Sequence, residues 1–154
     1  MKEAGMSEGA DAAEVAHCGL YCGDCFGHKG RVADLARDLR KELRDSKFKR
    51  FADFMATTGF GAVYKDYDAC YEVLGAMVKF RCRRGCRGDG GPPRCKIRDC
   101  CRKKGLQGCW ECGDFEGCGK LDFLGGVHGD ARLKNLRILS RKGPEAFITG
   151  KRHW

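Results

Sequence analysis

Twelve of the 154 residues are cysteine, and their spacing constrains the fold more than any other feature of the chain. Three cysteines fall within residues 18–25, eight fall within residues 82–118, and Cys70 stands alone. Thiols two or three residues apart reach one metal ion when the chain turns tightly between them. So many close pairs indicate metal–thiolate sites, because cysteines that merely fill a core show no such spacing.

The N-terminal segment bears on whether these thiols are oxidised. Residues 1–17 lack the apolar stretch of a secretory signal. We therefore expect a cytoplasmic protein with reduced thiols. The mean hydropathy is −0.50, and no run approaches the roughly 18 apolar residues of a membrane span. Hence no membrane association is expected.

The first cluster reads HCGLYCGDC over residues 17–25, with its thiols in C-x3-C-x2-C spacing. Radical S-adenosylmethionine enzymes share this spacing, but the chain lacks the length and strands of their barrel. A plain [4Fe–4S] site with a fourth cysteine from the second cluster stays open. Glycine follows several cysteines, and we expect positive φ angles that aim backbone N–H groups at sulfur. These glycines are Gly19, Gly23, Gly113 and Gly119.

The second cluster contains an irregular loop, because glycine and proline crowd residues 85–93. A segment so poor in aliphatic side chains folds only if something else supplies free energy, and metal binding does so directly. The C-x-x-C pairs at 22–25 and 109–112 also match redox motifs, but neither has the strand–helix context of a redox site. The cluster comprises Cys82, Cys86, Cys95, Cys100, Cys101, Cys109, Cys112 and Cys118.

Apolar residues at three- and four-residue spacing predict helices over residues 30–45, 48–57, 64–79 and 131–142. Gly143 should end the last helix, and Pro144 should begin one more turn. Cys70 falls on the expected apolar face of its helix, and we predict a core residue there. No stretch alternates as a strand does.

These patterns predict a mostly α protein, a small helical domain packed on an irregular, metal-stapled cysteine-rich module. Residues 1–16 should form a flexible acidic leader, and residues 17–154 a single domain. Its helical part should span about 29–80, its cysteine-rich module 81–121, and its C-terminal helices 130–150.

Charge is concentrated in residues 81–104, which hold ten bases and two acids. Two four-thiolate sites, each carrying −2 with its divalent ion, would lower the net charge of +9 to about +5. The bases therefore have an electrostatic role beside the thiolates. Nucleic-acid binding is the alternative, although only Phe80, Trp110 and Phe115 lie nearby as stacking aromatics.

Nothing in the sequence forms a recognisable catalytic set. Ser7, Ser46 and Ser140 lack a matching histidine and acid, and the glycines at 88–91 lack the other residues of a phosphate loop. All-cysteine zinc sites are closed, whereas catalytic zinc keeps an open position. No catalytic residue is therefore expected.

Several sequence elements in the same order resemble one family, the domain of unknown function 3795. They are CGLYCGDC at 18–25, CRRGCR at 82–87, CKIRDC at 95–100, KKG at 103–105 and CWECGDFEGCGKL at 109–121. The resemblance runs from His17 to about Leu121 and implies a small zinc-binding protein of unassigned activity. Cys101 stands where the family has a small apolar residue, and we therefore do not expect it to be a ligand.

The resemblance implies ten metal ligands, enough for two tetrahedral sites with two thiols to spare. The first cluster should recruit one ligand from residues 82–118. His17 and His28 flank that cluster and could contribute, although we expect both to be solvated. The implied ligands are Cys18, Cys22, Cys25, Cys82, Cys86, Cys95, Cys100, Cys109, Cys112 and Cys118.

Taken together, the sequence predicts structural Zn2+ in four-cysteine sites, and it leaves a protein partner open. An iron–sulfur protein with an electron-transfer or sensing role is one alternative, since a [4Fe–4S] cluster uses the same thiols. A zinc-stapled nucleic-acid-binding module is the other. The substrate, partner and pathway are not encoded in these patterns.

Overall fold

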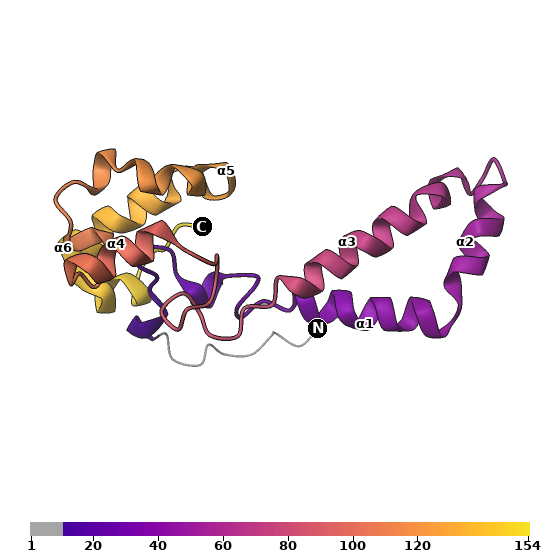
Figure 1. Ribbon diagram of the computed structural model, residues 1–154, viewed down its shortest axis with the longest axis horizontal. Coiled ribbons are helices and arrows are strands. Elements are labelled where there is room, and N and C mark those ends of the chain that lie inside the picture. The colour runs from indigo at the N-terminus through magenta and orange to yellow at the C-terminus, as the bar shows by residue number, and fades with distance from the viewer. Residues whose placement is uncertain (1–10) are drawn as a thin grey trace. The chain divides into compact units, whose positions relative to one another are not determined.

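The computed structural model describes residues 11–154, which are mostly helical as predicted (Figure 1). The described residues contain no strand, and their β structure is limited to one antiparallel bridge between Val15 and Tyr21. Contacts divide them into two compact units. One unit comprises residues 11–28 and 82–154, and the other comprises residues 29–81.

The unit of residues 29–81 is built from three α-helices at the predicted places. They are α1 (Val32–Asp45), α2 (Phe48–Ala56) and α3 (Tyr67–Lys79), with a 3-10 turn at Ala62–Asp66. Lys47 has a left-handed φ of 55° and separates α1 from α2. Helices α1 and α3 pack along each other, and α2 connects them at one end (Figure 1).

Aromatic side chains hold this unit together. The Phe48 ring centroid lies 5.3 Å from that of Phe51 and 5.8 Å from that of Tyr67. The Tyr67 ring stacks on Tyr71 at 6.1 Å. Such pairs add about 0.5–1.5 kcal/mol each to the area that they bury.

Cys70 is exposed, so its predicted place in the core is wrong. The packed face of α3 follows Tyr67, Tyr71 and Leu74, all of which are half-buried. Cys70 precedes Tyr71 directly and is therefore turned about 100° away from it around the helix. The apolar pattern located the helix correctly but misplaced the edge of its buried face.

The unit of residues 11–28 and 82–154 contains three α-helices. They are α4 (Lys96–Lys104), α5 (Gly125–His128) and α6 (Ala131–Thr149). Short 3-10 turns at Cys109–Glu111, Phe115–Gly117 and Gly119–Leu124 connect α4 to α5.

Helix α4 lies inside the module that was predicted to be irregular, and this part of the prediction is wrong. The helix begins directly after Cys95 and ends at Gly105, whose φ of 66° reverses the chain. Its apolar inward side chains are Ile97 and Cys101, while charged residues make up most of the remainder. Two apolar positions in nine residues are too few to reveal a helical period.

Helix α6 interrupts its regular geometry where the sequence predicted a break. Gly143 has a φ of 77°, and Pro144 follows it as the first residue of the last segment. The expected end of one helix and start of the next are therefore confirmed. Among the described residues, no helix is long and apolar enough to cross a membrane.

The core of this unit gathers side chains from segments far apart in the sequence. Ile97 of α4 packs with Leu136, Leu139 and Phe147 of α6. Val15 belongs to the same core and is fully buried. It lies within the segment expected as a leader, the first ten residues of which are outside the described range. The cysteine-rich segments are thus attached to a small apolar centre.

Leu136→Ala should lower the free energy of unfolding by about 2–5 kcal/mol, because Leu136 is fully buried and its removal leaves a cavity. Leu35→Ala is the control, since the side chain of Leu35 is 54% exposed. Chemical denaturation followed by circular dichroism measures both changes. Equal losses in the two variants would contradict this assignment of the core.

Candidate metal centres

Two pockets in the unit of residues 11–28 and 82–154 collect most of the ligands that the resemblance implies. The first pocket is lined by Cys18, Cys22, Cys25, Cys86 and Cys95. The second is lined by Cys100, Cys109, Cys112 and Cys118, together with Cys101. Cys82 lines neither pocket.

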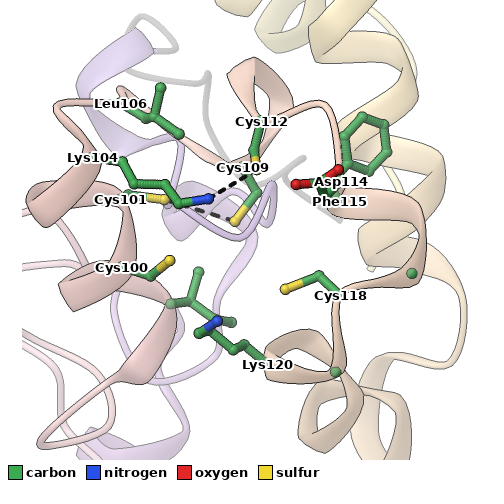
Figure 2. Close-up of a pocket in the computed structure, with 13 residues that line it drawn as sticks. Cys100, Cys101, Lys104, Leu106, Cys109, Cys112, Asp114, Phe115, Cys118 and Lys120 are labelled. Atoms are coloured by element: carbon green, nitrogen blue, oxygen red, sulfur yellow. Dashed lines mark hydrogen bonds between the residues drawn. The ribbon is translucent and has the colours of Figure 1, made fainter.

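Helix α4 and the chain after it position the thiols of the second pocket (Figure 2). Cys101 Sγ, on α4, lies 3.7 Å from Cys109 Sγ, on the 3-10 turn Cys109–Glu111. Figure 2 shows the sulfur atoms of Cys100 and Cys118 directed toward each other from opposite walls. This pocket has a volume of about 270 Å³.

Cys101 was not expected to be a ligand, yet it is the thiol in closest contact with Cys109. The contact between the two thiols lowers the pKa of Cys101 below its usual range. The same contact raises the pKa of Cys109. The two sulfur atoms are therefore close enough to share a proton or to be held by one metal ion.

Lys104 supplies positive charge at the second pocket. Its Nζ lies 3.7 Å from Cys112 Sγ (Figure 2). The negative charge of the Cys112 thiolate, and then that of Cys100, raises the pKa of Lys104. This contact is the electrostatic role that the basic segment was expected to have.

In the first pocket, the two cysteine segments meet at Cys22 and Cys86. The Cys86 backbone N–H donates to Cys22 Sγ over 3.3 Å. A hydrogen bond from the Cys86 thiol, together with this N–H, lowers the pKa of Cys22 to about 6, although burial opposes the shift. The hydrogen bonds from Cys86 thus favour the thiolate form of Cys22. Burial raises the pKa of the neighbouring Cys18 to about 12.

Two glycines bring the 85–91 loop against sulfur atoms. A Cβ atom at Gly90 would lie 2.6 Å from Cys82 Sγ, and one at Gly91 would lie 3.2 Å from Cys86 Sγ. The sequence presented these glycines as an ordinary turn. Their role appears only when the loop and the thiols are placed together.

The glycines that directly follow cysteines behave differently from the prediction. Gly19 has the expected positive φ, at 84°. Gly23, Gly113 and Gly119 do not have positive φ, so the expectation is wrong for them. The chain turns after Cys22 in a 3-10 helix, which any L-residue can adopt.

Arg98 holds the same loop from inside the protein. Its side chain is buried, and Nη1 donates to the carbonyl oxygens of Cys86 and Gly90 over 3.2 and 2.8 Å. Its Nε lies 3.4 Å from the Asp89 carboxylate, which balances the charge. A guanidinium suits this task because it presents several donors in one plane.

Both histidines beside the first cluster were expected to be solvated, and that expectation is wrong. His17 is only 7% exposed, and burial together with Arg87 lowers its pKa to about 4. His28 is half-buried, and its Nδ1 lies 3.0 Å from the Cys82 carbonyl oxygen. The His17 carbonyl also accepts a hydrogen bond of 2.8 Å from the Cys109 N–H, joining the two clusters.

The donor chemistry of both pockets suits a thiophilic metal ion. Tetrahedral thiolates about 2.3 Å from zinc stand about 3.8 Å apart, close to the 3.7 Å between Cys101 Sγ and Cys109 Sγ. Within residues 11–154, however, no three cysteine, histidine, aspartate or glutamate side chains converge tightly enough to form a metal-binding group. The thiols line the pockets, and their side chains must rotate inward to share an ion.

The fold and these pockets define a helical protein with thiol-lined cavities on a cysteine-rich unit. The chain belongs to the family described as protein of unknown function (DUF3795), which matches residues 14–123. The resemblance found in the sequence is therefore confirmed. The comparison with curated proteins found no match, and neither did the comparison with solved structures.

Arg98→Met should lower the free energy of unfolding by about 1–3 kcal/mol, because it keeps the buried hydrocarbon but leaves loop carbonyls without donors. Arg102→Met is the matched control. Arg102 lies on the same helix and contacts the same Asp89 at 2.7 Å, but its side chain is 47% exposed. That change should cost less than about 1 kcal/mol. Chemical denaturation measures the free energy of unfolding of both variants. Equal losses would show that the hydrogen bonds from Arg98 to the loop carbonyl oxygens do not stabilise the protein.

Proposed function

We propose that this protein binds two zinc ions through cysteine thiolates, and that the ions stabilise the unit of residues 11–28 and 82–154. The observation that carries the proposal is the distribution of the cysteine thiols between the two pockets. Five thiols line each of the two pockets, and a tetrahedral zinc site needs four. The same distribution places thiols from both sequence clusters at two pockets of one unit.

The second pocket supports one complete site. Cys109, Cys112 and Cys118 follow α4 in the chain, and α4 offers the fourth ligand from Cys100 or Cys101. Small side-chain rotations bring such neighbours to a common ion. Lys104 beside Cys112 offsets part of the site's negative charge.

The first pocket supports the other site. Cys22 Sγ accepts a hydrogen bond from the Cys86 backbone N–H, and backbone donors orient the sulfur ligands of metal–thiolate centres in the same way. Cys18, Cys25 and Cys95 share the pocket and complete a set from both clusters. This arrangement fits the expectation that the first cluster takes a ligand from the second.

A structural role follows from the weakness of the loops. Residues 82–95 bury no large apolar side chain: the residues that are not exposed are cysteines, glycines and one arginine, so little apolar burial holds this segment. Zinc binding converts its own free energy into folding free energy in such segments. Four thiolates also leave no open position for a substrate.

The two alternatives predict different observations. An iron–sulfur cluster would occupy the same thiols of the first pocket and give the protein visible absorption. A nucleic-acid surface would need free bases. Arg87 instead donates to the Val15 carbonyl, and Arg102 pairs with Asp89. These two bases of the segment are therefore engaged by the protein itself.

Elemental analysis of protein from a metal-replete host should find two zinc ions per chain. Cys22→Ser with Cys25→Ser, and Cys109→Ser with Cys112→Ser, should each remove one ion, because only three of a pocket's five thiols then remain and a tetrahedral zinc site needs four. Cys70→Ser is the control, since Cys70 is exposed and lies in the other unit. Unchanged zinc content in both pocket variants would overturn the proposal. If the analysis found iron and acid-labile sulfide instead of zinc, the iron–sulfur alternative would replace the zinc proposal.

Gly90→Ala should weaken zinc binding at the first site by about 10–100-fold, the usual effect of disturbing the shell around a ligand. The added methyl group meets the Gly85 carbonyl oxygen at 2.5 Å and so shifts the loop that carries Cys86, a thiol of the first pocket. Gly113→Ala is the matched control, because its methyl group meets nothing within 4 Å. Competition with a zinc chelator measures the affinities. Equal affinity in the two variants would show that the loop does not support the site.

A further inference from the structure

The first pocket is a cavity of about 300 Å³ whose lining combines the thiols with an apolar rim. The rim is formed by Phe26, Phe123, Val127 and Trp154, which are 45%, 56%, 74% and 43% exposed. Single exposed apolar residues are common on protein surfaces. Four large ones around one opening are a feature of binding sites.

A metal ion does not account for this cavity. Thiolates around zinc lie in contact with one another, so the ion needs almost no space of its own. The second pocket is the useful comparison, because its walls include Lys104, Asp114 and Lys120 beside its thiols. The first pocket instead has an apolar opening. Something other than a coordinated ion is therefore needed to cover these side chains.

Buried polar atoms at the first pocket also await a partner. The Nδ1 atoms of His17 and His128 are both buried, and neither has a hydrogen-bond partner. His17 is more than nine-tenths buried, and both residues line the cavity. A buried nitrogen without a partner is unfavourable, and a bound polar group would relieve this by supplying the missing hydrogen bond.

We propose that this cavity binds a small, uncharged organic molecule that has an apolar body and one polar group. The apolar body lies against Val127, Phe123 and Trp154, and the polar group pairs with a histidine nitrogen. The volume falls at the lower end of the range for ligand pockets, about 300–1,000 Å³, which fits a molecule of two or three rings. This inference goes beyond metal binding and does not require it.

The probe for the test is N-phenylnaphthalen-1-amine, an uncharged aromatic amine whose fluorescence rises in an apolar site. It is titrated into the full chain as purified, with the metal content measured on the same sample. Val127→Asp places a charge at the rim and should weaken probe binding at least tenfold. Val63→Asp is the matched control, because Val63 is also 74% exposed but lies in the unit of residues 29–81. It should change the affinity less than twofold.

Both substituted side chains are largely exposed, so each variant should keep the circular dichroism and metal content of the parent protein. Probe binding that is lost in Val127→Asp and kept in Val63→Asp supports the cavity. Loss in Val63→Asp alone would assign the probe to the helical unit and overturn the proposal. So would the absence of saturable binding to the folded parent chain. Because metal content is read separately, a failed zinc proposal leaves this result interpretable.

Discussion

The buried guanidinium of Arg98 is the interaction on which the cysteine-rich unit depends. It donates to carbonyl oxygens on both sides of the 86–90 loop, and this loop carries Cys86 and the glycines that approach sulfur. Because Arg98 belongs to α4, the same helix also fixes Cys100 and Cys101 in the other pocket. One short helix thus sets the geometry of both groups of thiols.

The two units of the protein achieve stability in different ways. The unit of residues 29–81 relies on α1, α3 and an aromatic cluster around Tyr67. The other unit has a small apolar core, centred on Leu136 and Phe147, and attaches long irregular loops to it. Loops of that kind lose much conformational entropy on folding and bury little apolar surface in return. Metal ions at the thiols, as we propose, would compensate for this cost.

The two pockets have equal numbers of thiols but differ in charged and apolar lining, and this difference bears on function. The second pocket combines five thiols with Lys104, which suits a closed structural site. The first combines five thiols with an apolar opening and a buried, unpaired His17. If both hold zinc, the first ion would lie beneath a ligand cavity, although thiolates that fill its coordination shell would keep it from reacting.

Local patterns in the sequence determined much of this protein. Apolar periodicity located α1, α2, α3 and α6, and Gly143 before Pro144 marked the break in α6. The order of cysteine elements identified the family. These features depend on residues close together in the chain, so they can be read without a structure.

Only the tertiary structure decided which thiols meet and what surrounds them. Helix α4 escaped detection because its inward face has two apolar side chains, and Cys101 acquired a partner in Cys109 only through that helix. The burial of His17 and the exposure of Cys70 were likewise invisible. Each of these outcomes depends on contacts between segments distant in sequence, and no local period records such contacts.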